Sequence, residues 1–504
     1  MRALLRFGLV CLFPSTVGTF AAIPEDAPLL TPRAKEMVLA SAKISDARWD
    51  HRARLLWTNE TRSAHGVRAS SWYILSLMMR DQPGDRERAL EALRGVLAQQ
   101  IDDPGAAWDG TFFRTAEEAR PRHDARRWQD YDPNWRQFIG TVFSLLLIEY
   151  GDRIPAPEQS RIEDSLRRAV EGELHENRLL PSYTNIALMH GFLMAYAGER
   201  LKRPQWVRDG EAWLEAVYAG FIPHDSFDEF NSPTYYGVDL YGLALLRRHG
   251  ATPRLRELGR TMEAALWNDI ARFYHAGLHN LAGPYDRAYG MDMRHYVSLT
   301  GVWLGLALPA PLTPLPPLSP DMPHGNDFSF TPCFALLGVE IPPEAAVHFT
   351  RFSGERQLTR PIADGKRVAT AWLGDAIMIG AESTGLGRDT RGANAQFRPA
   401  TIHWRAPGGE VGWIALIQSP RVNARASRNT LAIEAIGEST LRLSVPGADD
   451  TQLALDHWVL PGLDVRIETD AETFSVQPGK GVIDVIYARA TRIVLRTTPR
   501  PASP

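Results

Sequence analysis

Apolar residues recur every three or four positions from about residue 33 to residue 307, which is the spacing of one face of an α-helix. Helix-turn-helix pairs return along this stretch, although no strict sequence repeat is present. Repeated antiparallel hairpins that each bury one face predict an (α/α) toroid, closed or nearly closed. The predicted helices with the clearest pattern are Trp135–Tyr150, Glu158–Leu174, Asn185–Ala197, Trp206–Ala219, Gly237–Arg248, Pro253–His275 and Met293–Leu306.

The pattern changes after a proline-rich run at residues 308–320, which is typical of a stiff extended linker. Beyond it, β-branched and partly alternating stretches are separated by Gly, Pro and Asp, and these predict an antiparallel β-sandwich. We therefore expect an α+β multidomain protein with the toroid at residues 23–307, the linker at 308–323 and the sandwich at 324–504. The predicted strands are Arg367–Leu373, Ala376–Gly380, Thr401–Arg405, Val411–Ile417, Thr440–Val445 and Val482–Tyr487.

The first 22 residues have the features of an export signal. Arg2 and Arg6 form a basic start, an apolar stretch follows, and small residues end at Ala22. No later apolar run reaches the roughly 18 residues needed to cross a bilayer. These features predict a periplasmic or secreted protein that is not bound to a membrane once residues 1–22 are removed.

Composition narrows the class of function. The 504 residues are too many for one hydrophobic core, so more than one domain is expected. The 56 basic residues against 59 acidic ones argue against a nucleic-acid partner, although they allow a local arginine-lined site for a polyanion. The chain has no zinc-ligand spacing, P-loop or dinucleotide fingerprint, so no cofactor and no metal site is predicted. The state of oligomerisation stays open.

Four stretches are richer in polar and aromatic residues than a scaffold needs. Pro181–Asn185 opens an apolar helix, where Asn185 is either an N-cap or a neutral amide that faces substrate. His190 follows on the same helix as a candidate substrate-binding residue. Phe227–Gly237 combines a carboxylate, an amide, a hydroxyl, a proline and two phenols at a helix entrance. Its candidates are Glu229, Asn231, Tyr235 and Tyr236.

The other two stretches are Gly283–Tyr296 and Arg388–Trp404. The first contains Gly283 and Gly290 and contributes the candidates Arg287, Tyr289, Arg294 and His295. Its structural alternative is an Arg–Asp network that ties the loop down. The second precedes a predicted strand and contributes His403, which is either a site residue or a buried core histidine.

These residue types suit β-elimination from a uronic acid. An ionised substrate carboxylate opposes formation of the carbanion, and Asn185, Arg287 or a protonated histidine would offset the charge that develops. A tyrosine whose phenol pKa is lowered by neighbouring arginines would act as base, as acid, or as both. Aromatic residues are the candidates for sugar subsites: Trp108, Phe112, Trp128, Tyr131 and Trp135.

The combination of export signal, toroid, proline-rich linker and β-sandwich resembles the heparinase II/III, alginate and chondroitin lyases of this architecture. In that family an Asn at a helix start is followed by the catalytic Tyr, often in a Ser-Pro-x-Tyr context. Here Asn185 is followed 50 residues later by Tyr235 in Ser232-Pro-Thr-Tyr235. The resemblance covers most of the chain in architecture but only these short patches in sequence.

The resemblance implies that Asn185 neutralises the substrate carboxylate and that Tyr235 is the acid and base. The family's histidine near the Asn or Tyr is replaced here by Ile186 and Tyr236, so His403 or His295 is expected to fill that role. The prediction is thus an exported polysaccharide lyase acting on an acidic polysaccharide or oligosaccharide. Its rivals are an inverting glycosidase on a similar toroid, with carboxylates from Asp228, Glu229, Asp286 and Asp292, and a non-catalytic carbohydrate-binding protein.

Overall fold

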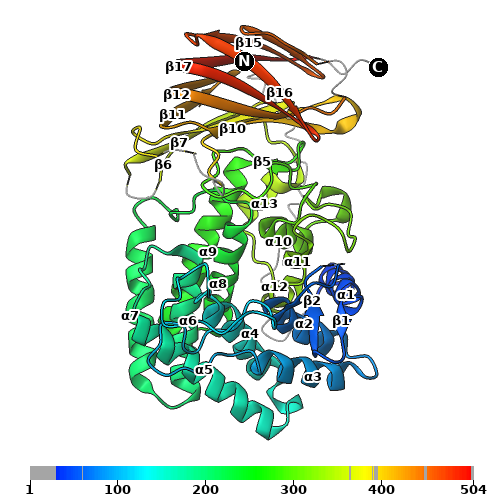
Figure 1. Ribbon diagram of the computed structural model, residues 1–504, viewed down its shortest axis with the longest axis vertical. Helices are drawn as coiled ribbons and strands as arrows, with labels where there is room; N and C mark the ends of the chain where they lie inside the picture. Colours follow the sequence, from blue (N-terminus) through cyan, green and yellow to red (C-terminus); the bar gives the residue numbers. More distant parts are fainter. Residues whose placement is uncertain are drawn as a thin grey trace, which may run out of the picture.

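The computed structural model describes residues 30–59, 61–362, 365–388, 390, 396–447 and 451–500. The helices form one body and the strands lie across one end of it (Figure 1). This order, helical part first and antiparallel part second, is the one the sequence predicts. The predicted signal peptide at residues 1–22 lies outside the described residues.

The helical part is a ring of antiparallel hairpins. The inner helices α2, α4, α6 and α8 contact one another in that order, and the outer helices α3, α5, α7 and α9 each pack against an inner neighbour. The bounds are α1 (Pro32–Asp46), α2 (Val67–Arg80), α3 (Asp85–Leu97), α4 (Trp135–Tyr150), α5 (Ala156–Glu176), α6 (Thr184–Arg200), α7 (Pro204–Phe221), α8 (Tyr235–His249), α9 (Pro253–Phe273) and α10 (Leu299–Ala307).

Inner and outer helices differ in how far burial extends around them. On α6 every residue from Thr184 to Gly198 is buried, as expected for a helix enclosed on all sides. On α7 only Trp206, Gly210, Leu214, Val217 and Phe221 are buried, which is a single stripe at three- and four-residue spacing. None of the described helices is long and apolar enough to cross a membrane.

The helical part continues beyond the proline-rich run, through α11 (Gly325–Phe328), α12 (Thr331–Leu337) and α13 (Pro343–Thr350). α12 contacts both α8 and α2 and so closes the ring, and Phe330 before it stacks on Trp72 with ring centroids 4.3 Å apart. The prediction that the β domain begins at residue 324 is therefore wrong. A seven-residue helix buried along its whole length shows no helical periodicity in sequence.

The predicted helix at Met293–Leu306 also begins later than expected. Residues 293–298 form a loop, and α10 starts at Leu299, because the Ser298 hydroxyl accepts a hydrogen bond from the Gly301 amide at 3.1 Å and caps the helix. Five short strands lie among the described helices. β1 (Trp49–Asp50), β2 (Leu55–Trp57) and β3 (His65–Gly66) form one small sheet, and β4 (Tyr274–His275) pairs with β5 (Asn280–Leu281).

The described strands of the C-terminal part form a 12-stranded antiparallel sheet in the order β13-β14-β15-β17-β12-β10-β9-β8-β7-β6, with β16 beside β17. β11 pairs with both β12 and β8, so the sheet folds back and encloses its own core. The bounds are β6 (Arg356–Ile362), β7 (Arg367–Leu373), β8 (Ile377–Ser383), β9 (Ala400–Arg405), β10 (Val411–Gln418), β11 (Val422–Ser427), β12 (Thr430–Ser444), β13 (Gln452–Leu453), β14 (His457–Leu460), β15 (Leu463–Thr469), β16 (Thr473–Gly479) and β17 (Val482–Pro499).

Strands β7 to β10 lie between the helices and the remaining strands, as Figure 1 shows for β7 and β10. Side chains on these strands alternate between two cores because successive residues point to opposite faces. Met378 and Ala371 belong to the core of the helical part, whereas Ile377, Ile379 and Trp372 belong to the core of the β domain. This layer therefore joins the two parts and fixes the loops that lie between them.

Candidate active site

The N-terminus of α6 supplies the first part of the candidate site. The Asn185 amide nitrogen Nδ2 donates to Glu229 Oε2 at 2.7 Å and to Thr184 Oγ1 at 3.1 Å. The Thr184 hydroxyl donates to the same Glu229 oxygen at 2.8 Å. Thr184 has a φ of 26°, which a β-branched residue adopts only when its surroundings impose it. Asn185 is therefore a ligand of the Glu229 carboxylate and not a helix cap.

Glu229 joins α6 to the Gly283–Tyr296 segment. Its second oxygen, Oε1, accepts a hydrogen bond from Arg287 Nη1 at 2.6 Å. The Arg287 guanidinium carbon lies 3.8 Å from the centroid of the Tyr235 ring, in a cation–π contact. The Tyr235 hydroxyl lies 2.6 Å from the Tyr289 hydroxyl. Three of the predicted stretches thus bring Asn185, Glu229, Arg287, Tyr235 and Tyr289 together, although more than 100 residues separate the first from the last.

Ser232 ties the Tyr235 helix to the arginine segment. Its hydroxyl oxygen accepts from the Tyr235 amide at 3.1 Å, and the hydroxyl donates to the Arg287 carbonyl at 2.6 Å. The Ser-Pro pair before Tyr235 therefore places the start of α8 against the backbone that carries the guanidinium. This fixes the distance between the cation and the phenol ring.

The segment that carries Arg287 is held by the β domain. Tyr285 and Arg398 pair as an antiparallel bridge, with N–O distances of 3.0 and 2.8 Å. The side-chain oxygen of Gln396 accepts from Arg287 Nε at 3.1 Å. Gly380 on β8 leaves room for this approach, because an added Cβ there would lie 1.9 Å from the Gly283 carbonyl oxygen. The β domain thus sets the position of the arginine.

Asp286 anchors the same segment through buried charge. Its carboxylate, 4 % exposed, accepts from Arg367 Nη2 at 2.7 Å and from Arg388 Nη1 at 2.8 Å. Its amide donates to the Phe230 carbonyl at 3.1 Å, and the Phe230 amide donates back to its carboxylate at 3.2 Å. The Arg–Asp network considered from sequence is therefore present. It holds Phe230, which follows Glu229, against Asp286, which precedes Arg287.

The Tyr235 phenol is held in its protonated form in the unliganded protein. Burial is the main cause that raises the pKa of Tyr235, and the Tyr289 hydroxyl adds to the rise, whereas Arg287 opposes it. The prediction of a lowered phenol pKa is wrong for this state, because desolvation of a phenolate outweighs the attraction of one arginine.

Asp239 lies on α8 four residues after Tyr235 and is fully buried. Neither of its carboxyl oxygens has a hydrogen-bond partner within the described part of the chain. Burial raises the pKa of the Asp239 carboxyl well above its usual value, and the neighbouring Glu229 charge raises it further. Burial therefore favours the neutral form of the Asp239 carboxyl.

A pocket of about 590 Å³ opens beside Tyr289, between the helical part and the β domain. His295, His324 and Glu410 also line it. The His324 ring stacks on the Tyr289 ring with centroids 4.7 Å apart. His295 is 64 % exposed, and its hydrogen bond to Asp292 raises its pKa. The structure therefore places His295 at the pocket and not against Asn185.

Arg294 lies near the same pocket but binds the β domain. Its side chain is half-buried, and its Nη2 donates to the Gly409 carbonyl at 3.3 Å. Among the described residues its side-chain partners are Gly409 and Asp292 and not Glu229 or Tyr235, so a role in substrate binding stays a prediction.

Two candidates in the Phe227–Gly237 stretch are structural. Tyr236 is fully buried, and its hydroxyl donates to the buried Asp269 carboxylate at 3.5 Å. Asn231 is 1 % exposed, and its Nδ2 donates to the carbonyls of Ala282 and Pro284 at 2.6 and 2.9 Å. Catalysis by Tyr236 and substrate binding by Asn231 are therefore contradicted, because both polar groups are used inside the protein.

The histidine predictions at His403 and His190 are also contradicted. His403 is fully buried under the Gly283–Tyr296 segment, with Nε2 2.9 Å from the Met291 carbonyl oxygen. His190 is 4 % exposed and packs edge-on against Trp213 with ring centroids 5.2 Å apart. Burial lowers the pKa of each imidazole to about 4, so both are neutral and neither reaches substrate.

The predicted aromatic subsites differ in exposure. Trp135 is 9 % exposed, and the Arg68 guanidinium covers its ring at 5.2 Å from the centroid. Phe112 and Tyr131 are buried, and Trp108 is half-buried and donates to Asp103. Trp128 is 47 % exposed, with a φ of 69° and the Arg178 guanidinium 5.7 Å from its ring centroid. Trp128 is thus the aromatic candidate with most surface to offer a sugar.

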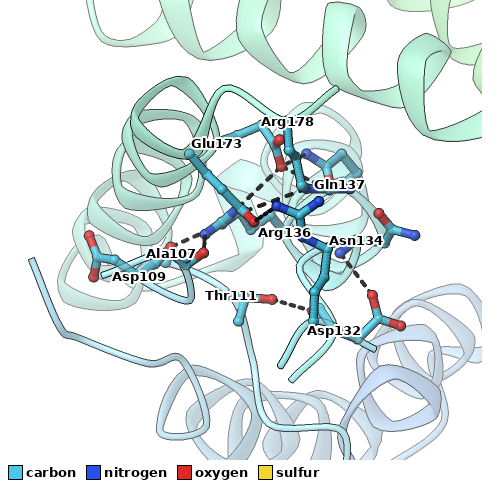
Figure 2. Close-up of polar contacts among 12 residues, drawn as sticks. Ala107, Asp109, Thr111, Asp132, Asn134, Arg136, Gln137, Glu173 and Arg178 are labelled. Carbon is cyan, nitrogen blue, oxygen red and sulfur yellow. Dashed lines mark hydrogen bonds and ion pairs between the residues drawn. The ribbon is translucent and has the colours of Figure 1, made fainter. Parts of the chain in front are cut away.

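A buried network of ion pairs joins the start of α4 to the end of α5 (Figure 2). Arg136, which is fully buried, donates through Nη1 to Glu173 at 3.2 Å and to Glu176 at 2.7 Å. Its Nε donates to the Asp109 carbonyl at 2.9 Å, and Arg178 donates to Glu173 at 3.0 Å. The network joins the start of α4, the end of α5 and the loops that carry Trp108 and Trp128.

Sequence reasoning did not single out Thr184, Gln396 or His324. Thr184 and Gln396 lie inside two of the polar stretches that the sequence analysis names, so the polar residues around them indicate their part of the site. His324 follows the proline-rich run, and nothing in its surroundings indicates that its ring reaches Tyr289.

Solved structures share this architecture. Chondroitin AC lyase from Streptomyces coelicolor A3, in complex with chondroitin sulphate, matches with a TM-score of 0.52 and 13 % identity over 93 % of this chain and 79 % of that chain. Heparinase III matches with a TM-score of 0.48 and 9 % identity over 96 % and 87 % of the two chains. Xanthan lyase from Paenibacillus matches with a TM-score of 0.46 and 10 % identity over 94 % and 57 %. No curated protein matches the chain.

The likeness to chondroitin AC lyase confirms the predicted fold, a helical toroid with an antiparallel β domain as in polysaccharide lyases of this type. Within that fold, the chain belongs to the family described as domain of unknown function DUF8769, whose model matches residues 35–339. A second model, domain of unknown function DUF8770, matches residues 351–480. The two models correspond to the helical part and most of the β domain.

Proposed function

We propose that this protein is an exported polysaccharide lyase that cleaves an acidic, uronic-acid-containing polysaccharide by β-elimination. The observation that carries the proposal is the convergence of Tyr235, Arg287 and Asn185 at one site in a fold shared with polysaccharide lyases. The basic and apolar start of residues 1–22 supports export to the periplasm or beyond. N-terminal sequencing of the mature protein tests the export.

In the proposed reaction Tyr235 transfers the proton. The Tyr235 phenol first gives up its proton, and the phenolate then takes the proton from carbon 5 of the uronate unit. The phenol that this forms protonates the oxygen that leaves carbon 4. Arg287, whose guanidinium lies over the Tyr235 ring, offsets the negative charge on the phenolate. The Tyr289 hydroxyl, 2.6 Å from that of Tyr235, offers a path for the proton toward the pocket.

The rival glycosidase mechanism needs one carboxylic acid and one carboxylate that both face the scissile bond. Three of the four candidate carboxylates are committed to other groups. Asp286 accepts from two arginines, Asp292 accepts from His295, and Glu229 accepts from Asn185, Thr184 and Arg287. We therefore favour elimination over hydrolysis.

The test is incubation with a panel of uronate polymers while absorbance of the conjugated unsaturated product is followed in the ultraviolet. Elimination forms this double bond, whereas hydrolysis gives new reducing ends without it. A non-catalytic binding protein would retain the polymers without either product. Reducing ends without ultraviolet absorbance would contradict the lyase and favour the glycosidase.

A further inference from the structure

Glu229 places a negative charge where a uronate lyase is expected to receive the carboxylate of its substrate. Both of its oxygens are held, Oε2 by Asn185 at 2.7 Å and by Thr184 at 2.8 Å, and Oε1 by Arg287 at 2.6 Å. Three donors from α6 and the Gly283–Tyr296 segment thus surround one carboxylate of the protein itself.

The donors that remain for a substrate are few. One Asn185 Nδ2 hydrogen points to Glu229 and the other to Thr184 at 3.1 Å, so this amide has none left to donate. Arg287 uses Nη1 for Glu229 and Nε for Gln396 at 3.1 Å. Asn185, the amide that sequence assigns to the substrate carboxylate, is therefore engaged already, and Arg287 is engaged in part.

Glu229 is also poorly placed to move aside. Its side chain is 14 % exposed, and the next residue, Phe230, is hydrogen-bonded in both directions to Asp286, which two arginines hold. The strained φ of Thr184 fits a contact that the fold maintains. We therefore treat Glu229 as a fixed anion.

The fixed negative charge of Glu229 disfavours a second negative charge beside it. Burial is the main cause that raises the pKa of the Asp239 carboxyl, and the Glu229 charge raises it further. An ionised uronate carboxylate beside Glu229 would meet the same repulsion, because like charges in a partly buried site disfavour each other strongly.

We propose that the uronate unit cleaved at this site carries an uncharged carboxyl group, as in a methyl-esterified uronan, and that Glu229 is the specificity-determining residue. This proposal rests on the proposed lyase function. An ester carbonyl accepts the charge that develops at carbon 5 more readily than an ionised carboxylate does, so the reaction depends less on a neutralising donor such as Asn185.

The step balances with the groups already named. The Tyr235 phenolate takes the proton from carbon 5, and the electron pair of that bond forms the double bond to carbon 4. The bond from carbon 4 to the glycosidic oxygen breaks, and its electron pair leaves with the oxygen. The Tyr235 phenol then protonates that oxygen. The ester is unchanged, and no oxidant or reductant is required.

The experiment compares matched polymers, each supplied as the free acid and as its methyl ester. The ratio of kcat/KM for ester over acid is divided by the ratio of the two base-catalysed rates measured without protein, which removes the greater intrinsic reactivity of the ester. We expect a corrected preference of about 10²-fold for the ester. A preference for the free acid would overturn the proposal.

Glu229→Gln tests the cause of the preference, since it removes the charge and nearly keeps the shape. We expect the corrected ratio to fall to within a few-fold of one, mainly because the free acid is now accepted. Glu158→Gln is the matched control, because Glu158 is also buried and bound by an arginine, Arg94, at the far end of α5. Its ratio should equal that of the wild type.

Outcomes separate this proposal from the lyase function. If no polymer of any pair gives an unsaturated product, the lyase function fails. If free acids are cleaved better and Glu229→Gln lowers their cleavage, the lyase stands and the role given to Glu229 fails. Should Glu229→Gln not fold, inhibition of the wild type by short esterified and free-acid oligosaccharides decides, and equal inhibition would contradict the proposal.

Discussion

Tyr235→Phe separates chemistry from folding at this site. The substitution removes one hydroxyl, whose hydrogen-bond partner among the described residues is the Tyr289 hydroxyl at 2.6 Å. Loss of a bond between two neutral hydroxyls costs about 1 kcal/mol of unfolding free energy, and less where water can replace it at the half-buried Tyr289. The phenylalanine ring keeps its contact with Arg287, 3.8 Å from the present ring centroid.

The same change removes the group that transfers the proton in the proposed mechanism. We expect kcat to fall about 10²-fold or more, which corresponds to about 2.7 kcal/mol in the barrier, while KM stays within a few-fold. The assay is the ultraviolet absorbance of unsaturated product, with urea unfolding measured in parallel. Tyr196→Phe, a change at a buried tyrosine of α6 outside the site, is the control. A Tyr235→Phe protein with near-normal kcat would refute the role of Tyr235.

Three further substitutions test other parts of the molecule. Asp286→Asn leaves Arg367 and Arg388 short of a buried carboxylate, so urea unfolding should show a loss of about 3 kcal/mol; a loss below 0.5 kcal/mol would contradict the anchoring role. His403 has its pKa lowered to about 4 by burial. Below about pH 6.5 the His403 side chain therefore binds a proton in the unfolded chain but not in the folded protein. The free energy of unfolding is at its full value above that pH and declines as the pH falls toward 4. His403→Gln should reduce this decline by about 1.4 kcal/mol per pH unit, measured by urea unfolding at several pH values, and an unchanged slope would show that His403 is not the cause. Trp128→Ala should raise KM for a polymer about tenfold with kcat nearly unchanged, and an unaltered KM would remove Trp128 from the substrate-binding surface.

The sequence carried the architecture because periodicity is strong where a helix or strand buries one face. The predicted helix Trp135–Tyr150 and the predicted strand Arg367–Leu373 have the observed bounds. The helix at Thr331–Leu337 was missed because all seven of its residues are buried, so no polar face marks its period. Fold class was therefore accessible, and the boundary between the two parts was not.

The candidate site was predictable in part. The Ser-Pro-Thr-Tyr235 pattern located the tyrosine that meets Arg287, but sequence could not distinguish Tyr235 from Tyr236. The two tyrosines are consecutive residues of α8, and only the packing shows that Tyr236 points toward Asp269. His403 lies on a strand buried on both faces, where alternation does not identify a site residue. The engagement of Asn185 by Glu229 joins residues 44 positions apart, and no local pattern encodes it.

The strand layer from β7 to β10 makes the helical part and the β domain depend on each other. Each of these strands must satisfy two partners at once, since Met378 fits the helices and its neighbour Ile379 fits the outer strands. A one-residue slip in register would exchange the two sets and damage both cores together. The regions matched by the two family models, 35–339 and 351–480, therefore act as halves of one unit. A protein that contained only the region matched by the first model would need another domain or partner to bury the apolar residues at that end of its toroid.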